Sequence, residues 1–169
     1  GLGSVGLLTA YYFRLKGYKN LYVTDLNLQK KKIAKKLKLN FIEFKNVDNC
    51  DSIINTTSSY NVLNDSFAKL NLDGKFIEAS WYGNKIGKLN LGNEFHSKRL
   101  KIISSQVSNI PVHMKKKHNY KSRLKIAIDA LSNDEIMTLI NSKSKFKNLE
   151  NDYMSILNNK NIIVHAIKY

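Results

Sequence analysis

Apolar residues follow two alternating spacings along this chain. Between residues 4 and 16 they recur every three or four positions, which is typical of a helix with one apolar face. The residues expected on that face are Val5, Leu8, Tyr12 and Leu15. Short apolar runs bounded by polar residues predict buried strands at 21–24, 41–44, 52–55, 75–79 and 100–103. Strands that alternate with helices favour a parallel sheet with right-handed crossovers, which is an α/β fold.

Further helices are expected at residues 27–37, 60–70, 121–131 and 149–156. The helix at 121–131 is expected to pack through four inward-facing residues, Leu124, Ala127, Ile128 and Leu131. The remaining expected elements are a turn at Asn71–Gly74, a linker at Asn141–Asn148 and a last strand at Asn161–Ile167. The last helix and strand need not belong to the main sheet.

The chain begins with a G-x-G-x-x-G pattern directly before the first expected helix. In a dinucleotide-binding unit the first glycine permits a tight turn, the second lets the backbone approach a pyrophosphate, and the third allows close helix packing. The phosphates then lie over the N–H groups at the positive helix end. The residues expected to bind a cofactor here are Gly1, Gly3, Ser4, Val5 and Gly6. The implied fold is a doubly wound parallel sheet of the Rossmann type, with the first strand missing.

Asp25 follows the strand at 21–24 and stands 19 residues after Gly6. A dinucleotide site requires a carboxylate at about this distance to accept hydrogen bonds from the adenosine ribose. That carboxylate would repel a 2′-phosphate, so we expect NAD rather than NADP. Asp is also favoured as a helix cap, which is the alternative role for Asp25. Lys30 lies one helical turn later, close enough to reach the same ribose.

Small polar residues follow three more of the expected strands. Open α/β sheets bind ligands outside the carboxyl ends of their strands. Small side chains at those ends leave room for a flat cofactor and supply hydrogen-bonding groups. We therefore expect Thr57, Ser80 and Ser104 to contact the cofactor.

The composition adds a net charge of +15, which raises the question of nucleic-acid binding. Lysine accounts for 25 of the 28 basic residues, a skew typical of AT-rich coding sequence. A protein that grips phosphate or reads guanine would use more arginine, because the guanidinium binds in a bidentate manner. No specific nucleic-acid partner is therefore expected. The single cysteine excludes an intrachain disulfide, and no run of apolar residues is long enough for a membrane span.

Residues with a recognisable catalytic or metal-binding pattern are missing from the sequence. The four histidines show no metal-ligand spacing, and there is neither a nucleophile elbow nor a phosphate-loop lysine. No catalytic residue and no metal ligand is expected within this chain.

Several segments together resemble the zinc-type medium-chain dehydrogenase/reductase family, which includes the alcohol dehydrogenases. The resemblance runs from Gly1 to nearly the end of the chain. It rests on Gly1–Leu8, on Asp25-Leu26-Asn27 with Lys30, on Asp51–Thr57, and on Gly74–Gly83. Phe95–Leu100 and Ile103–Ser108 resemble the bacteriochlorophyllide dehydrogenase-like and polyol dehydrogenase branches. The sequence departs from the family at Ser58 and Ser80, where glycine is usual, and either change would narrow the pocket or alter cofactor preference.

This resemblance implies that residues 1–142 form an N-terminally truncated dinucleotide-binding domain. Residues 143–169 would return to a GroES-like catalytic domain whose main part, with its zinc ligands, lies upstream of Gly1. The implied function is hydride transfer between an alcohol or polyol and NAD by a longer cytoplasmic enzyme, with the fragment itself inactive. Relatives that assemble imply a homodimer or a homotetramer, and the partner is a small-molecule alcohol.

Two other functions remain open on the residues alone. A methyltransferase also places an acid after its second strand, but its loop usually reads G-x-G-x-G, unlike Gly1–Gly6. A basic nucleic-acid-binding module without catalysis is the other alternative.

Overall fold

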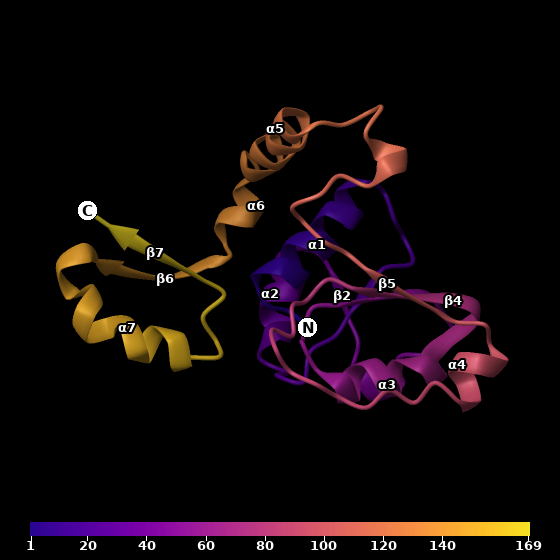
Figure 1. Cartoon of the computed structure of the whole chain (residues 1–169). Coiled ribbons are helices and arrows are strands. Elements are labelled where there is room, and N and C mark those ends of the chain that lie inside the picture. Colours follow the sequence, from indigo (N-terminus) through magenta and orange to yellow (C-terminus); the bar gives the residue numbers. More distant parts are fainter. The chain divides into compact units, whose positions relative to one another are not determined.

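The computed structural model describes all residues from Gly1 to Tyr169 (Figure 1). The chain forms two compact units. The first unit contains Gly1 and Ile42–Pro111, and the second contains Leu2–Phe41 and Val112–Tyr169. Each unit has its own buried hydrophobic cluster. None of the helices combines the length and the hydrophobicity needed to cross a membrane.

The first unit is built around a three-stranded parallel sheet in the order β3-β4-β5. Its elements are η1 (Phe44–Asn46), β3 (Cys50–Asn55), α3 (Tyr60–Lys69), β4 (Leu70–Glu78), α4 (Asn93–Ser97) and β5 (Lys101–Ser104). The strands expected at 52–55, 75–79 and 100–103 and the helix expected at 60–70 are confirmed. Helix α4 was not expected.

Two expectations for the first unit are wrong in detail. Residues Asn71–Gly74 do not separate two elements, because β4 runs through them and its register with β3 shifts there. Asp73 absorbs the irregularity with a φ of 61°, and its backbone N–H donates to Lys98 O at 2.7 Å. The strand expected at 41–44 ends at Phe41, because Phe44 already begins η1.

The core of the first unit lies between α3 and the sheet. Its buried members are Leu63, Phe67, Leu70, Phe76 and Leu100. Phe67 contacts Phe76 edge to face, with the ring centroids 6.4 Å apart. Residues 56–59 alone connect β3 to α3, so the N-terminal end of α3 follows closely on the carboxyl end of β3.

The second unit carries two separate pairs of parallel strands, β1-β2 and β6-β7. Its first elements are α1 (Ser4–Leu15), β1 (Tyr22–Val23), α2 (Lys30–Lys36) and β2 (Asn40–Phe41). Its later elements are η2 (Val112–Met114), α5 (Tyr120–Leu131), α6 (Asp134–Met137), β6 (Ile140–Lys145), η3 (Phe146–Asn148), α7 (Leu149–Asn158) and β7 (Val164–Lys168). The last strand, β7, pairs only with β6, in a two-stranded sheet that is separate from β3-β4-β5.

The linker expected at Asn141–Asn148 is wrong, because most of it is strand β6. This stretch has few apolar residues, so its strand character comes from pairing with β7 rather than from its own pattern. The expected boundary between residues 142 and 143 falls within β6. The division of the chain into two domains at this boundary stays a prediction.

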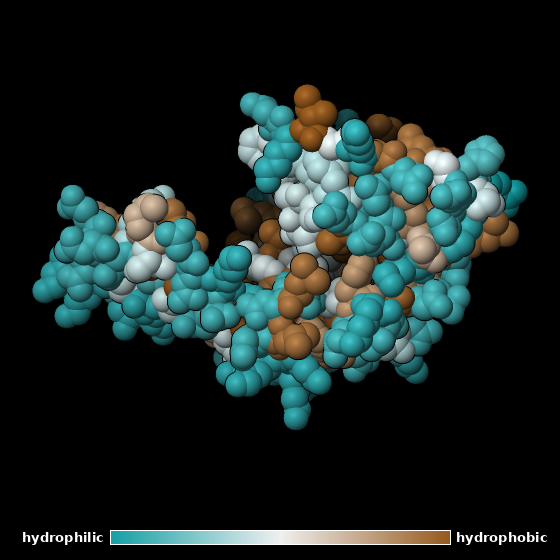
Figure 2. All heavy atoms as spheres, turned by 90° about the horizontal axis from the view of Figure 1, so that it is seen from below, coloured by the Kyte–Doolittle hydropathy of each residue, from teal (hydrophilic) through white to brown (hydrophobic).

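The apolar faces expected for two helices also differ from the structure. Helix α1 buries Leu7, Ala10 and Tyr11, whereas the expected Val5, Tyr12 and Leu15 are exposed. Both sets have helical spacing, so periodicity alone could not choose between them. Helix α5 exposes its expected inward residues Leu124, Ile128 and Leu131, because little of the unit packs on it. Hydrophobic side chains also gather at the surface on the face seen in Figure 2.

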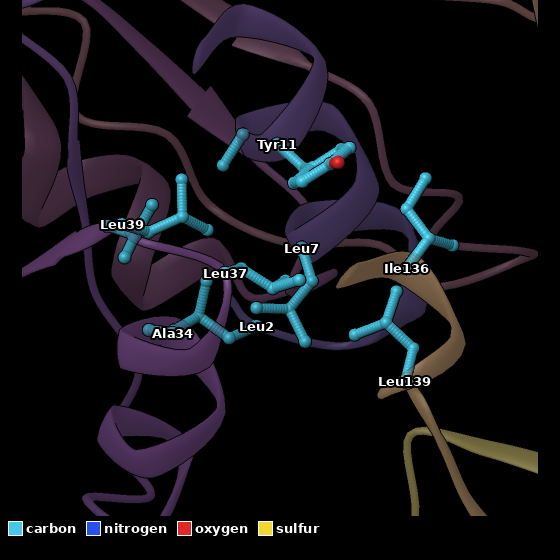
Figure 3. Packing of buried hydrophobic residues seen from close by; sticks show 10 residues of the cluster. Leu2, Leu7, Tyr11, Ala34, Leu37, Leu39, Ile136 and Leu139 are labelled. Carbon is cyan, nitrogen blue, oxygen red and sulfur yellow. The ribbon is translucent and has the colours of Figure 1, made fainter. Parts of the chain in front are cut away.

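The core of the second unit joins α1, β1, α2 and α6. Figure 3 shows Leu7 of α1 together with Ala34 of α2, Ile136 of α6 and leucines from the adjoining segments. The full set of buried members is Leu2, Leu7, Ala10, Tyr11, Val23, Ala34, Leu37, Leu39, Ile136 and Leu139. Because Leu2 belongs to this cluster, the packing of the core fixes the segment that leads into α1.

Glu135 of α6 forms ion pairs with two basic residues of the same unit. Its carboxylate contacts Arg14 of α1, and it lies 2.6 Å from Lys38 Nζ. The hydrogen bond from Lys38 is the main cause that lowers the pKa of the Glu135 carboxyl, and the charge of Arg14 adds to it. These contacts fasten α6 to the N-terminal part of the unit.

We expect Leu7→Ala to lower the free energy of unfolding by about 2–5 kcal/mol, because it opens a cavity in a fully buried site. Leu15→Ala is the matched control, since Leu15 lies in the same helix and is 46% exposed. The control should cost less than about 1 kcal/mol. Urea denaturation followed by circular dichroism measures both. Equal losses for the two variants would contradict the assignment of the buried face.

We expect the stabilisation by Glu135 to disappear in acid. A carboxyl whose pKa is lower in the folded state contributes fully above its unfolded pKa of about 4.3 and loses that contribution as the pH falls further. The stability difference between the unaltered chain and Glu135→Gln should therefore shrink below about pH 4. Thermal melts from neutral to acid pH measure it, with the exposed Glu150→Gln as a charge-matched control. A difference that stays constant with pH would exclude the ion pairs as its source.

Candidate functional site

The N-terminal end of α1 has no side-chain cap. Gly3 is the N-cap residue, and no side chain accepts from the first helical N–H groups. The first intrahelical bond runs from Leu7 N to Gly3 O at 3.0 Å, so the N–H groups of the preceding helical residues have no acceptor within the helix. No acidic residue lies in the first turn. The positive end of a 12-residue helix is thus available to an anion.

The first two glycines of the motif meet different surroundings. A Cβ atom on Gly1 would lie 2.7 Å from Thr57 Cγ2, so a side chain there would collide with the segment after β3. Thr56 Oγ1 also donates a hydrogen bond of 2.9 Å to Gly1 O. A Cβ atom on Gly3 would meet nothing within 4 Å. The space at Gly3, beside the uncapped helix end, is therefore open.

The carboxylate of Asp25 is held against the glycine loop. Its Oδ2 atom accepts from Leu2 N at 2.6 Å, and its Oδ1 atom accepts from Asn27 N at 2.8 Å. Each oxygen keeps a further lone pair for a ligand hydroxyl. The alternative role as a helix cap is wrong, because α2 begins at Lys30 with Gln29 as its N-cap residue.

Lys30 is a buried lysine, with 8% of its surface exposed. Burial lowers the pKa of its ammonium group, and the nearby charge of Asp25 opposes that effect. The structure therefore brings Lys30 and Asp25 together, as the sequence spacing predicted. It also sets Lys30 apart from the exposed lysines that cover the rest of α2.

In the first unit the carboxyl ends of three strands lie in register. Asn55 of β3 pairs with Glu78 of β4, which pairs with Ser104 of β5. Thr57 Oγ1 donates to Asn55 Oδ1 at 2.7 Å. The expected residues Thr57, Ser80 and Ser104 thus all lie at or just after strand ends, on the carboxyl-end side of one sheet.

Three polar residues at this edge were not expected from the sequence: Asn55, Glu78 and Tyr82. Asn55 is almost fully buried, and its side chain donates to Glu78 Oε2 at 2.8 Å. Tyr82 Oη donates to the same oxygen at 2.9 Å. Burial raises the pKa of the Tyr82 hydroxyl, and its hydrogen bond to Glu78 raises it further. The only sign of this cluster in the sequence was that two neighbouring strands each end in a polar residue, Asn55 and Glu78.

No group of three or more His, Cys, Asp or Glu residues lies close enough together to hold a metal ion. His165 of β7 contacts two serines instead, with Ser144 Oγ and Ser142 Oγ each 2.9 Å from one of its ring nitrogens. The donor set for zinc is therefore not found in this chain, and we assign no zinc-dependent step to its residues.

No protein-family model matches the sequence, and no curated protein sequence matches it. Solved structures of dehydrogenases match it along its whole length. The L-idonate 5-dehydrogenase of Escherichia coli K-12 is 12% identical, with a TM-score of 0.79, over 100% of this chain and 48% of that one. The chain has a Rossmann-like dehydrogenase fold.

Two further dehydrogenase structures were solved with cofactors. A short chain alcohol dehydrogenase from Escherichia coli CFT073, in complex with NADH, is 15% identical, with a TM-score of 0.74, over 96% of this chain and 48% of that one. The glucose dehydrogenase of Haloferax mediterranei, in complex with NADP, zinc and gluconolactone, is 17% identical, with a TM-score of 0.71, over 100% and 49%. The chain thus spans about half the length of these dehydrogenases. At such identities the likeness establishes the fold alone.

Proposed function

We propose that the chain binds a nicotinamide dinucleotide as the cofactor-binding part of an alcohol or polyol dehydrogenase. The observation that carries this proposal is the hydrogen bond between Leu2 N and Asp25 Oδ2. It holds a carboxylate suited to ribose hydroxyls against a glycine loop that opens directly into an uncapped helix. The NADH and NADP complexes of the structural neighbours support the same class of cofactor.

The second unit would bind the phosphates and the adenosine ribose. The backbone N–H groups of Gly3, Ser4, Val5 and Gly6 face the phosphates, where the helix dipole favours negative charge. Asp25 would accept hydrogen bonds from the ribose hydroxyls, and the Lys30 ammonium group would donate a hydrogen bond to the same sugar. Because a 2′-phosphate would meet the Asp25 carboxylate, we expect NAD to be preferred over NADP.

The first unit would bind the nicotinamide end. Thr57, Ser80 and Ser104 supply small polar groups at adjoining strand ends, and their size leaves room for a flat ring. A nicotinamide cofactor held there would supply the hydride acceptor for oxidation of an alcohol. The residues of this chain bind and orient that cofactor. No residue of this chain is assigned to the alcohol substrate.

We expect Gly3→Ala to abolish most NADH binding without unfolding the chain. The added methyl group meets no protein atom, so it would occupy the space that the phosphate needs. The NADH dissociation constant should rise more than about tenfold, because a lost hydrogen-bonded anion contact costs at least about 1.4 kcal/mol. Calorimetric titration measures it. Gly92→Ala is the control, since Gly92 is also a helix N-cap residue and its Cβ would have ordinary room. Unchanged NADH affinity in Gly3→Ala would rule out the phosphate role.

We expect Asp25→Ala to shift the cofactor preference from NADH toward NADPH by about tenfold or more, which corresponds to about 1.4 kcal/mol. The reason is the loss of both ribose acceptors and of the charge that repels a 2′-phosphate. The ratio of the two dissociation constants is the measured quantity, because the variant also loses the bond to Leu2 and could weaken both nucleotides together. Asp129→Ala, an exposed change in the same unit, should leave the ratio unaltered. An unaltered ratio in Asp25→Ala itself would count against the ribose role.

A further inference from the structure

The Glu78 carboxylate accepts hydrogen bonds from four donors. Oε2 accepts from Asn55 Nδ2 at 2.8 Å and from Tyr82 Oη at 2.9 Å. Oε1 accepts from Ser80 N at 2.9 Å and from the Ser80 hydroxyl. Both oxygens of a carboxylate can accept hydrogen bonds, which matches this set of donors. Its donors come from the end of β3 and from the segment after β4, so one side chain joins two strand ends.

A second layer of hydrogen bonds extends this network to the backbone. Ser80 Oγ accepts from Ser58 N at 2.9 Å, and Ser58 Oγ donates to Trp81 O at 3.0 Å. Asn55 Oδ1 accepts from Thr57 N at 3.1 Å. Through these contacts Glu78 fixes residues 57–58 and 80–82 to each other.

Ser58 has a reason to need such support. Its φ of 53° lies in the left-handed region, which costs a residue with a side chain more than it costs glycine. Both its N–H and its hydroxyl are tied to the segment after β4. The network therefore holds a conformation that a glycine would adopt without assistance.

Glu78 also forms no ion pair with a basic residue. Its carboxylate is instead surrounded by hydrogen-bond donors. It stands at the centre of the three strand ends, between Asn55 and Ser104. A negative charge at that position favours a positively charged ligand group over a neutral one of the same shape.

We propose that Glu78 is the positioning residue for the nicotinamide end of the cofactor, and that its charge strengthens the binding of oxidised NAD relative to that of NADH. This inference rests on the proposed function. The oxidised nicotinamide ring carries a positive charge and the reduced ring is neutral. The hydrogen bonds of Glu78 order residues 57–58 and 80–82 for both forms, whereas its charge attracts the oxidised form alone.

Two variants and one control separate the effect of the Glu78 charge from the effect of its hydrogen bonds. Glu78→Gln removes the charge and replaces one acceptor oxygen by an NH₂ group, which faces hydrogen-bond donors of its neighbours. Tyr82→Phe removes one donor of the network and keeps the charge. Glu43→Gln is the matched control, because Glu43 lies in the same unit and forms only an exposed pair with Lys45 at 3.0 Å. Thermal melts establish that each variant is folded.

Calorimetric titrations with oxidised NAD and with NADH then give two dissociation constants for each folded protein. For Glu78→Gln we expect weaker binding of both forms. The ratio of the two dissociation constants should also shift by about fivefold toward NADH, the size expected of a partly screened unit charge. For Tyr82→Phe we expect both constants to rise by a similar factor. The control should match the unaltered chain. Trp81 is the single tryptophan and is 88% exposed, so quenching of its emission reports the order of its segment independently of the nucleotide.

An unchanged ratio of the two constants in Glu78→Gln would overturn the role of the charge. Unchanged binding and unchanged Trp81 quenching in both Glu78→Gln and Tyr82→Phe would overturn the positioning role. If Glu78→Gln does not fold, Tyr82→Phe still tests positioning by its effect on affinity and quenching. If the unaltered chain binds neither nucleotide, the proposed function itself is overturned. The variants test only the role of Glu78, so the two failures can be told apart.

Discussion

One hydrogen bond, from the backbone N–H of Leu2 to the Asp25 carboxylate, sets the geometry of the candidate site in the second unit. Leu2 is anchored in the hydrophobic core, so the bond joins a fixed backbone to a side chain that would otherwise move in solvent. Asn27 N holds the other carboxylate oxygen, and Lys30 is buried nearby. The glycine loop, the helix dipole and the acid are useful to a dinucleotide only when they lie together, and this bond brings them together.

In the first unit the corresponding constraint is strand register. Parallel pairing aligns Asn55, Glu78 and Ser104, and the hydrogen bonds of Glu78 then order the segments that follow β3 and β4. Gly1 belongs to this edge too, since a side chain there would collide with Thr57. In the first unit, therefore, strand pairing fixes a polar side chain, and that side chain fixes the loops beside it.

The sequence was most informative where the signal is local. The glycine motif, the helix after it and the acid after β1 follow from spacing within one stretch of chain, and the structure places Lys30 beside Asp25 as expected. Features that depend on distant pairing could not be predicted in this way. The polar stretch of β6 becomes a strand only through β7, and the network of Glu78 requires the register of three strands. The buried face of α1 was misread because two sets of apolar residues have the same period.

The central claim is that the glycine loop with Asp25, and the strand ends of the first unit, each contact a nicotinamide dinucleotide. Backbone amide NMR spectra of the chain, recorded as NADH is added, test it most directly. The account predicts saturable shifts at residues 3–6 and 25 and at the strand ends near 57, 80 and 104. Shifts confined to the lysine-rich stretches at 31–38 and 115–117, or no saturable shifts at all, would contradict it.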